Sequence, residues 1–370
     1  MRGSIVQRKS KQGKILYYVV VPYGGRQKWL KVPGDQTKKN AEAYRAQVVT
    51  EANQGALFEL PKITFAEFAA KWQATAAPDL APNTVKGYEV YLKNYILPAF
   101  GGRQLAHITQ EEIQRWKVQL LDRLAPVTVK TTLARLKHLF RVAVDWQYLI
   151  KNPATGVPAP RVPKTDVVFL RPEQIRTLLD ATTNHQWRTF FLVAVTGGLR
   201  IGELVAMKWQ SLDWDTGRYL VCEAYQYMGQ PKGFKAPKSD YSVGSVQLSP
   251  ICMDHLKKHK GQLAEYQLKT ADYQDLDLIF PRRKGTVHDP RGIQARIWTP
   301  LLGRAALPSM RLHDLRHTCA ALLIDQGESP KYVQQQLRHS SIKITFDTYG
   351  HLFPEKGQEA AERLDKTLFG

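Results

Sequence analysis

The stretch "RHSSIKITFDTYGH", residues 338–351, brings two histidines and one tyrosine together among small hydroxyl-bearing side chains. Tyr349 stands between Thr348 and Gly350, so it is the one bulky ring in its immediate neighbourhood. Taken alone, a tyrosine near a helix end is most often a core or surface side chain. Whether its hydroxyl reacts depends on the polar groups that the rest of the chain supplies.

The segment "RLHDLRHTCAALLIDQG", residues 311–327, supplies a histidine and an arginine. His313 and Arg316 are three residues apart, so they share one face of a predicted helix. A zinc site made of His313, Asp314 and His317 is the alternative. Arg316 on that face would repel a cation, and no further cluster completes the site. We therefore expect this face to bind an anion.

A second arginine follows a double glycine in "TGGLRIGEL", residues 196–204. Glycine allows the chain to change direction freely, so two helices are predicted to meet at Gly197 and Gly198. Arg200 then begins the second helix. By itself this pattern fits an ordinary salt-bridging arginine after a helix end, and it fits equally a guanidinium that points into a cleft.

The chain of 370 residues has a net charge of +20, which is spread along its whole length. Residues 1–60 hold 11 basic and 4 acidic residues, residues 61–163 hold 14 and 7, and residues 164–370 hold 28 and 22. A charged tail would concentrate the excess in one place. This distribution favours a polyanion such as nucleic acid, contacted by every part of the chain.

The chain length predicts two or three domains, and the cysteine content and the apolar segments indicate a cytoplasmic protein. Three widely spaced cysteines, Cys222, Cys252 and Cys319, argue against a disulfide framework and favour a reducing compartment. The first residues lack the apolar stretch of a signal peptide, and no apolar run approaches the ~20 residues of a membrane span. We expect a bacterial cytoplasmic location, with the protein at the nucleoid when it is bound to DNA.

The fold class predicted from periodicity is mainly α with small β elements, in several domains. Pro98 is expected to end a helix that begins near Asn83. The pattern along the chain predicts short strands within 4–32, a helix over 37–55, helices over 62–152, a proline-rich linker, and a mixed, mostly helical remainder with strands at 217–224 and 241–248.

Several common reaction types lack their motifs in this chain. There is no GxSxG hydrolase elbow, no P-loop, and no clustered Asp/Glu set that would hold two magnesium ions. Metal-assisted phosphoryl transfer therefore has no support in the sequence.

Taken in chain order, "TGGLRIGEL", "HDLRHTCAALLIDQG" and "LRHSSIKITFDTYGH", followed by "HLFPEKGQEAAERLD", resemble the tyrosine recombinase family of the phage-integrase type. The resemblance covers nearly the whole chain. It implies an arm-type DNA-binding domain at 1–60 (three-stranded sheet plus helix), a helical, SAM-like core-binding domain at 61–152, a linker at 153–164 and a catalytic domain at 165–370.

The resemblance also assigns roles to single residues. Arg200 matches the family's first catalytic arginine, His313 and Arg316 its HxxR pair, His339 its second histidine and Tyr349 its nucleophile. The family carries a further lysine on a β-hairpin. Here "GFKAPKSDYSVGSVQL" offers Lys238, favoured by its distance from the second strand, or Lys235, and the choice between them stays open.

These residue types suit transfer of a DNA strand without metal or cofactor. Two permanently charged guanidinium groups match the phosphate oxygens on which charge grows. Tyrosine has a pKa near ~10, so its proton must be removed, and His313, with an ordinary pKa near ~6.5, suits that task. Lys238 would protonate the departing 5′ oxygen, and His339 would hydrogen-bond the phosphate. The family implies a 3′-phosphotyrosyl intermediate and no ATP.

The expected partner is double-stranded DNA at core-type and arm-type sites, bound by a homotetramer on two duplexes. Host DNA-bending and excision proteins are possible accessory partners, and no membrane is involved. The main interpretation is a site-specific integrase of a phage or other mobile element. The alternatives are a Xer-type resolvase, which the extra module at 1–60 disfavours, a type IB topoisomerase, and a DNA-binding regulator that has lost catalysis.

Overall fold

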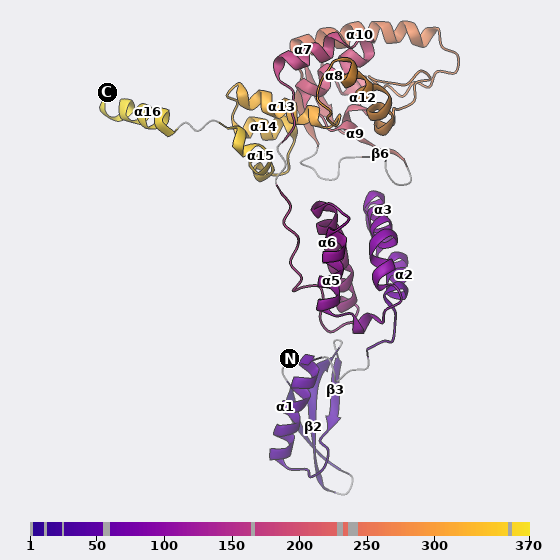
Figure 1. Ribbon diagram of the computed structural model, residues 1–370, viewed down its shortest axis with the longest axis vertical. Helices are drawn as coiled ribbons and strands as arrows, with labels where there is room; N and C mark the ends of the chain where they lie inside the picture. Colours follow the sequence, from indigo (N-terminus) through magenta and orange to yellow (C-terminus); the bar gives the residue numbers. More distant parts are fainter. Residues whose placement is uncertain are drawn as a thin grey trace. The chain divides into compact units, whose positions relative to one another are not determined.

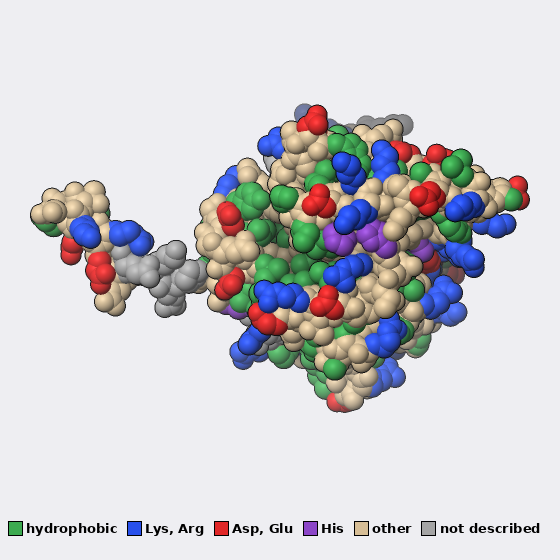
Figure 2. Space-filling model, turned by 90° about the horizontal axis from the view of Figure 1, so that it is seen from above, with side chains coloured by type: hydrophobic (Ala, Val, Ile, Leu, Met, Phe, Trp, Pro, Cys, Tyr) green, Lys and Arg blue, Asp and Glu red, His purple; other side chains and the backbone are tan. Residues whose placement is uncertain are grey.

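The computed structural model describes residues 3–10, 13–23, 26–54, 60–163, 167–227, 232–235, 243–353 and 357–370 (Figure 1). The chain divides into two compact units, Met1–Pro163 and Lys164–Gly370. Within the described ranges no helix is both long and apolar enough to cross a membrane. Lys and Arg side chains are scattered over the face drawn in Figure 2 rather than gathered in one patch.

The first unit begins with a three-stranded antiparallel sheet, as the sequence predicted. Strands β1 (Ser4–Lys9), β2 (Ile15–Tyr23) and β3 (Arg26–Lys31) are joined in chain order, and helix α1 (Lys38–Gln54) follows. The Thr37 hydroxyl accepts the backbone N–H of Asn40 at 3.2 Å, which makes Thr37 the predicted cap of α1. Alternation along β2 buries Val19 and Val21 against α1.

The rest of this unit is helical. Its elements are α2 (Phe65–Thr75), the short η1 (Ala77–Asp79), α3 (Pro82–Tyr91), the π-type turn η2 (Leu92–Ile96), α4 (Leu97–Phe100), the short η3 (Leu105–His107), α5 (Gln110–Leu121) and α6 (Pro126–Asp145). Helix α6 buries the stripe expected from its sequence, at Val129, Leu133, Leu136, Phe140 and Ala143. Capping boxes at Thr64–Glu67 and Thr109–Glu112 start α2 and α5.

The expectation that Pro98 ends its helix is wrong. The helix passes through the π-type turn η2, in which the N–H of Leu97 donates to the carbonyl of Leu92, and it continues to Phe100. Proline has no N–H to donate and its ring clashes with the carbonyl four residues earlier. The wider π turn just before Pro98 absorbs both effects.

The first residues of the predicted linker pack onto the helical part. Ala154 and Val157 belong to its core. Lys137 donates to the carbonyl of Val157 at 2.6 Å, and Lys117 donates to the carbonyl of Pro158 at 3.0 Å. These two lysines stabilise the chain where it leaves α6.

The second unit is mixed but mostly helical. It contains α7 (Pro172–Asp180), α8 (His185–Gly197), α9 (Ile201–Leu204), the short η4 (Trp209–Ser211), α10 (Pro250–Leu268), α11 (Pro290–Ile293), the π-type η6 (Gln294–Trp298), α12 (Thr299–Arg304), α13 (Asp314–Asp325), α14 (Pro330–Leu337), α15 (Ile342–Tyr349), the short η7 (Gly350–Leu352) and α16 (Gly357–Phe369). Strands β4 (Arg218–Val221) and β7 (Gly244–Gln247) pair, as do β5 (Ala224–Gln226) and β6 (Gly233–Lys235).

The described residues of this second unit form two apolar clusters. The larger one surrounds α8, whose residues from Thr189 to Val195 are all buried. The smaller one joins α13, α14 and α15 and consists of Cys319, Ala320, Ile324, Val333, Leu337 and Tyr349. The smaller cluster therefore fixes the end of α15, where the tyrosine of the opening stretch lies.

Candidate active site

The turn between α8 and α9 depends on glycine. Gly198 has a left-handed backbone with φ of +61°, and a Cβ atom built on it would lie 2.6 Å from Cδ2 of Leu337. Both the backbone conformation and the lack of space require a residue without a side chain. The turn makes Arg200 the residue that precedes α9, as the sequence indicated.

Glu203 holds Arg200 in place. The Arg200 backbone N–H donates to Oε2 of Glu203 at 2.8 Å, and Nη1 of Arg200 donates to Oε1 at 2.9 Å. Nη2 of Arg200 donates to the carbonyl of Arg338 at 3.2 Å. Glu203 is buried, whereas 38% of the Arg200 side chain is exposed. The Arg200 guanidinium is therefore oriented by the buried Glu203 and is still accessible to an anion.

Arg316, in the first turn of α13, lies in the same group. Its side chain is buried, with Nη1 donating to the carbonyl of Gly198 at 2.6 Å and Nη2 donating to the carbonyl of Leu337. Burial and then the charge of Arg200 lower the pKa of Arg316 to about 9, so it is still charged at neutral pH. A buried cation held mainly by carbonyls is well suited to receive a phosphate.

Tyr349 is the last residue of α15 and only 1% of it is exposed. Its hydroxyl lies 2.6 Å from Nδ1 of His317, and its ring stacks on His339 with centroids 6.3 Å apart. Burial raises the pKa of Tyr349 to about 12, although the charge of Arg316 acts in the opposite direction. The phenol is thus protonated in this state and is hydrogen-bonded to an imidazole.

The histidines of the group are neutral at pH 7. Loss of water around the ring, followed by the charge of Arg316, lowers the pKa of His313 to about 4 and that of His339 to about 3. Burial also lowers the pKa of His317. His313 nevertheless belongs to the exposed residues, whereas His317 and His339 are half-buried. Nδ1 of His339 lies 2.9 Å from the hydroxyl of Thr345.

The structure thus brings together five of the six predicted site residues: Arg200, His313, Arg316, His339 and Tyr349. The ring of His313 lies 5.7 Å from that of His317, which contacts Tyr349. Lys238 lies outside the described residues. Lys235 ends β6 and is exposed. The choice between the two lysines therefore stays open.

Sequence reasoning missed three members of the group. His317 was considered only as a metal ligand, although its spacing from His313 is one helical turn. Glu203 follows Arg200 by three residues, a spacing that allows a salt bridge and gave a usable signal. Arg338 gave no signal in the sequence. It follows α14 with a left-handed backbone, in which arginine is uncommon, so no sequence pattern placed it in the site.

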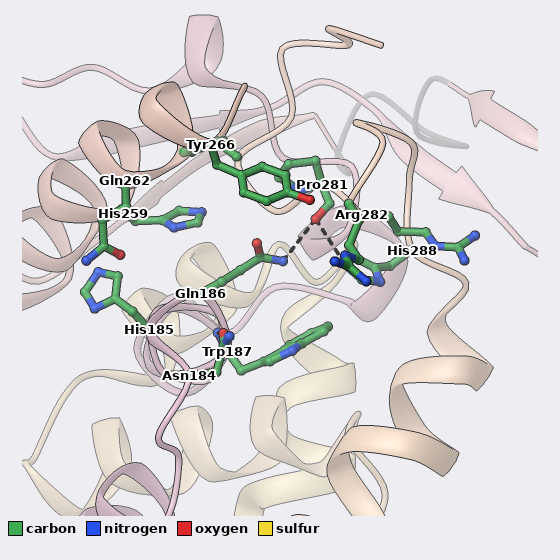
Figure 3. Close-up of a pocket in the computed structure, with 12 residues that line it drawn as sticks. Asn184, His185, Gln186, Trp187, His259, Gln262, Tyr266, Pro281, Arg282 and His288 are labelled. Carbon is green, nitrogen blue, oxygen red and sulfur yellow. Dashed lines mark hydrogen bonds between the residues drawn. The ribbon is translucent and has the colours of Figure 1, made fainter. Parts of the chain in front are cut away.

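A separate cavity of about 340 Å³ shares no residue with this group. It lies between the start of α8, α10 and the segment around Pro281 (Figure 3). Gln186 and His288 both donate to the Pro281 carbonyl, at 3.0 and 3.2 Å. Among the residues that the structure describes, no three His, Cys, Asp or Glu side chains are arranged to hold a metal ion.

Comparison with known proteins identifies the family. Residues 168–356 match the Phage integrase family, and this range contains every residue of the group around Tyr349. The chain belongs to the phage integrase family. Residues 64–121 match the N-terminal SAM-like domain of phage integrases, in the helical part of the first unit.

Similar proteins include a tyrosine recombinase and an integrase. The integrase-family chain is 28% identical to a "Tyrosine recombinase XerC-like" protein of Caldanaerobacter subterraneus subsp. tengcongensis, over 96% of this chain and 97% of the relative. It is 26% identical to the ICEBs1 integrase of Bacillus subtilis, over 91% and 92% of the two chains. The sequence-based identification as a tyrosine recombinase, a DNA strand-transferring enzyme, is confirmed.

Solved structures show the same fold. The integrase of the Tn1549 transposon, in complex with a circular intermediate DNA, aligns with a TM-score of 0.70 at 16% identity, over 83% of this chain and 99% of that one. The lambda integrase tetramer bound to a Holliday junction aligns with a TM-score of 0.60 at 17% identity, over 95% of each chain. The predicted multidomain, mostly helical fold is confirmed.

Proposed function

We propose that Tyr349 is the nucleophile of a site-specific integrase and that Arg200 and Arg316 bind the phosphate it attacks. The observation that carries this proposal is the contact of the Tyr349 hydroxyl with His317, beside the buried charge of Arg316. A phenol, an imidazole and two guanidinium groups supply a nucleophile, a proton acceptor and stabilisation of the transition state.

The reaction balances without further groups. Oη of Tyr349 attacks phosphorus, the bond between phosphorus and the 5′ oxygen breaks, and the phenol proton passes to a histidine. The 5′ oxygen leaves with a proton from the hairpin lysine, Lys238 or Lys235. A 5′-hydroxyl from a partner strand then attacks the phosphorus of the 3′-phosphotyrosyl bond and gives its proton to the lysine. The tyrosine oxygen leaves and takes its proton back from the histidine, so the tyrosine is restored and the new strands are joined.

The geometry favours His317 over His313 as the group that takes the phenol proton. His317 is neutral at pH 7 and its Nδ1 lies at hydrogen-bond distance from the hydroxyl. His313 precedes α13 and is exposed, a location that suits contact with the incoming phosphate. The role first expected of His313 as proton acceptor therefore stays a prediction that competes with His317.

DNA binding must expose the nucleophile. With 1% of its surface accessible, Tyr349 cannot reach a phosphodiester until α15 or its neighbours shift. Thr345 is buried in the same helix, and its hydroxyl contacts His339, so it belongs to the segment that would move. A tyrosine that is covered in the absence of DNA also avoids unwanted strand breaks.

We further propose that residues 1–60 bind arm-type sites, residues 61–152 and 165–370 bind core-type sites, and four copies act on two duplexes. Two supports are the basic excess in each part and the likeness to the lambda integrase tetramer bound to a Holliday junction. Helix α16, with Leu364, Leu368 and Phe369 exposed, is available to pack on a neighbouring copy. Host DNA-bending or excision proteins, and a cytoplasmic location, belong to the same proposal.

The test is formation of a covalent protein–DNA adduct on a nicked duplex from the ends of the mobile element. The unmodified chain should form the adduct, and Tyr349→Phe should bind the duplex with similar affinity without forming it. An adduct with Tyr349→Phe would exclude Tyr349 as the nucleophile. Tight binding without an adduct by the unmodified chain would favour an inactive regulator.

A resolvase is the second candidate, because one relative is named XerC-like. Excision between two directly repeated sites would favour this second candidate.

A further inference from the structure

Arg338 combines an unusual backbone with a buried charge. It follows α14 with φ of 51° and ψ of 51°, a left-handed conformation that glycine adopts more easily than arginine. Only 3% of its side chain is exposed. A residue that served only to end the helix would need neither the long side chain nor its charge.

Arg338 contacts Arg200 by two routes. Its backbone carbonyl accepts Nη2 of Arg200 at 3.2 Å. Its guanidinium donates through Nη2 to Oε2 of Glu203, the carboxylate that also receives the backbone N–H and Nη1 of Arg200. Glu203 is therefore shared between two arginines in a closed ring of contacts.

The charges of this ring explain why a second arginine is useful. A buried carboxylate that paired with Arg200 alone would offset its positive charge and draw it away from an anion. Because Arg338 also pairs with Glu203, its guanidinium offsets part of the negative charge of the carboxylate. Arg200, Arg316 and Arg338 together outweigh the one carboxylate, which leaves a net positive group. Nε and Nη1 of Arg338 are buried without a hydrogen-bond partner among the described residues, so its interactions are directed at Glu203 rather than spread over many carbonyls.

We propose that Arg338 is a positioning residue that holds Glu203, and through it Arg200, in the orientation needed to bind the scissile phosphate. The inference rests on the proposed function of Arg200. It extends that function to a buried residue that acts through Glu203 rather than on the phosphate itself.

The test compares rates of adduct formation at saturating nicked duplex, together with the DNA dissociation constant. Arg338→Gly keeps the left-handed backbone and removes the guanidinium, and we expect the adduct rate to fall about 10-fold or more while DNA affinity changes by less than about 2-fold. Arg338→Lys keeps the positive charge but offers Glu203 only one point of contact, so its adduct rate should lie between that of Arg338→Gly and that of the unmodified chain.

Ala306→Gly is the matched control, because Ala306 has a similar φ of 50° in the same unit and is exposed. Its rate should equal that of the unmodified chain.

A double-mutant cycle shows whether Arg338 acts through Glu203. In a Glu203→Gln background, the added Arg338→Gly change should slow the reaction by less than about 2-fold. If the rate losses of the two single variants multiply in the double variant, the two residues act independently and the inference is overturned. An unchanged adduct rate for Arg338→Gly would also overturn it, as would an Arg338→Lys rate no higher than that of Arg338→Gly. All of these results are read against an unmodified chain that forms the adduct. If that chain formed none, the proposed function would fail first and the role of Arg338 would fall with it.

Discussion

The hydroxyl of Tyr349 and Nδ1 of His317 lie 2.6 Å apart and join the end of α15 to the first turn of α13. Their rings meet edge to face, with centroids 5.7 Å apart. Arg316 stands next to His317 in sequence, so the proposed proton acceptor and the proposed phosphate-binding guanidinium are carried by one helical turn. In our proposal, the position of the Tyr349 hydroxyl is thus tied to that of the phosphate site.

We expect His317→Ala to slow adduct formation about 10²-fold at pH 7, because the phenol loses its proton acceptor. The rate of this variant should rise with pH, as hydroxide replaces the missing base. His313→Ala serves as the comparison, and its rate should lack this rise if His313 binds phosphate. Single-turnover rates between pH 6 and 9 measure both effects. A His317→Ala rate equal to that of the unmodified chain would return the proton acceptor role to His313.

The buried imidazole of His339 should make the protein less stable in acid. Burial and then the charges of Arg316 and Arg200 lower its pKa to about 3 in the folded state, whereas the unfolded ring titrates near ~6.5. Between these values the unfolded state holds more protons, so stability falls as pH decreases below ~6.5, by up to about 1 kcal/mol per pH unit. His339→Gln does not titrate, and its melting temperature should fall less steeply between pH 7 and 5. Parallel slopes for the two proteins would contradict this.

Gly198→Ala should destabilise the second unit. The added Cβ meets Leu337 at 2.6 Å and the backbone φ is +61°, so we expect a loss of about 1–3 kcal/mol in the free energy of unfolding. Gly303→Ala is the control, because Gly303 lies in α12 and a Cβ added to it would meet no atom within 4 Å. Denaturant unfolding of the two variants should show a decrease for the first and no decrease for the second. Equal stabilities would mean that the turn tolerates a side chain.

The sequence predicted the elements, and it singled out the five described residues that the structure brings together, because both depend on local order and spacing. Periodicity locates the buried stripe of α6, and the double glycine locates the turn before Arg200. Prediction from local pattern failed at Pro98, where a π turn, which depends on packing around Leu92 and Ile96, carries the helix past the proline. Composition of a single segment does not reveal such a turn.

The contacts within the site were beyond the reach of the sequence for a related reason. His317 and Tyr349 are 32 residues apart, and Arg338 and Glu203 are 135 residues apart. Only the folded chain pairs them. For Tyr349 the family resemblance predicted a reactive hydroxyl rather than a core ring. The structure adds that the ring is also buried in an apolar cluster while its hydroxyl contacts the imidazole.

The outer face of the N-terminal sheet supports a last prediction. Arg8 lies over the ring of Trp29 at 4.2 Å, and Tyr18 meets the same ring at 6.1 Å, on the strands β1, β2 and β3. Trp29 is 38% exposed, so this basic and aromatic surface is accessible. Arg8→Ala combined with Trp29→Ala should weaken binding to arm-type DNA and lower integration, as deletion of residues 1–60 should. Neither change should alter adduct formation on a core-site duplex.

A matched control for this surface comes from the same sheet. Ile15 is also exposed, at 48%, and uncharged, so Ile15→Ala removes an exposed apolar side chain from β2 without removing a cation. Integration between two element-derived sites, measured with all three variants, checks the prediction. If the Arg8 and Trp29 double variant and the deletion both integrate as efficiently as the unmodified chain, the sheet does not bind a second DNA site. If these two variants lose adduct formation on core DNA as well, the module acts in cleavage itself rather than in bridging.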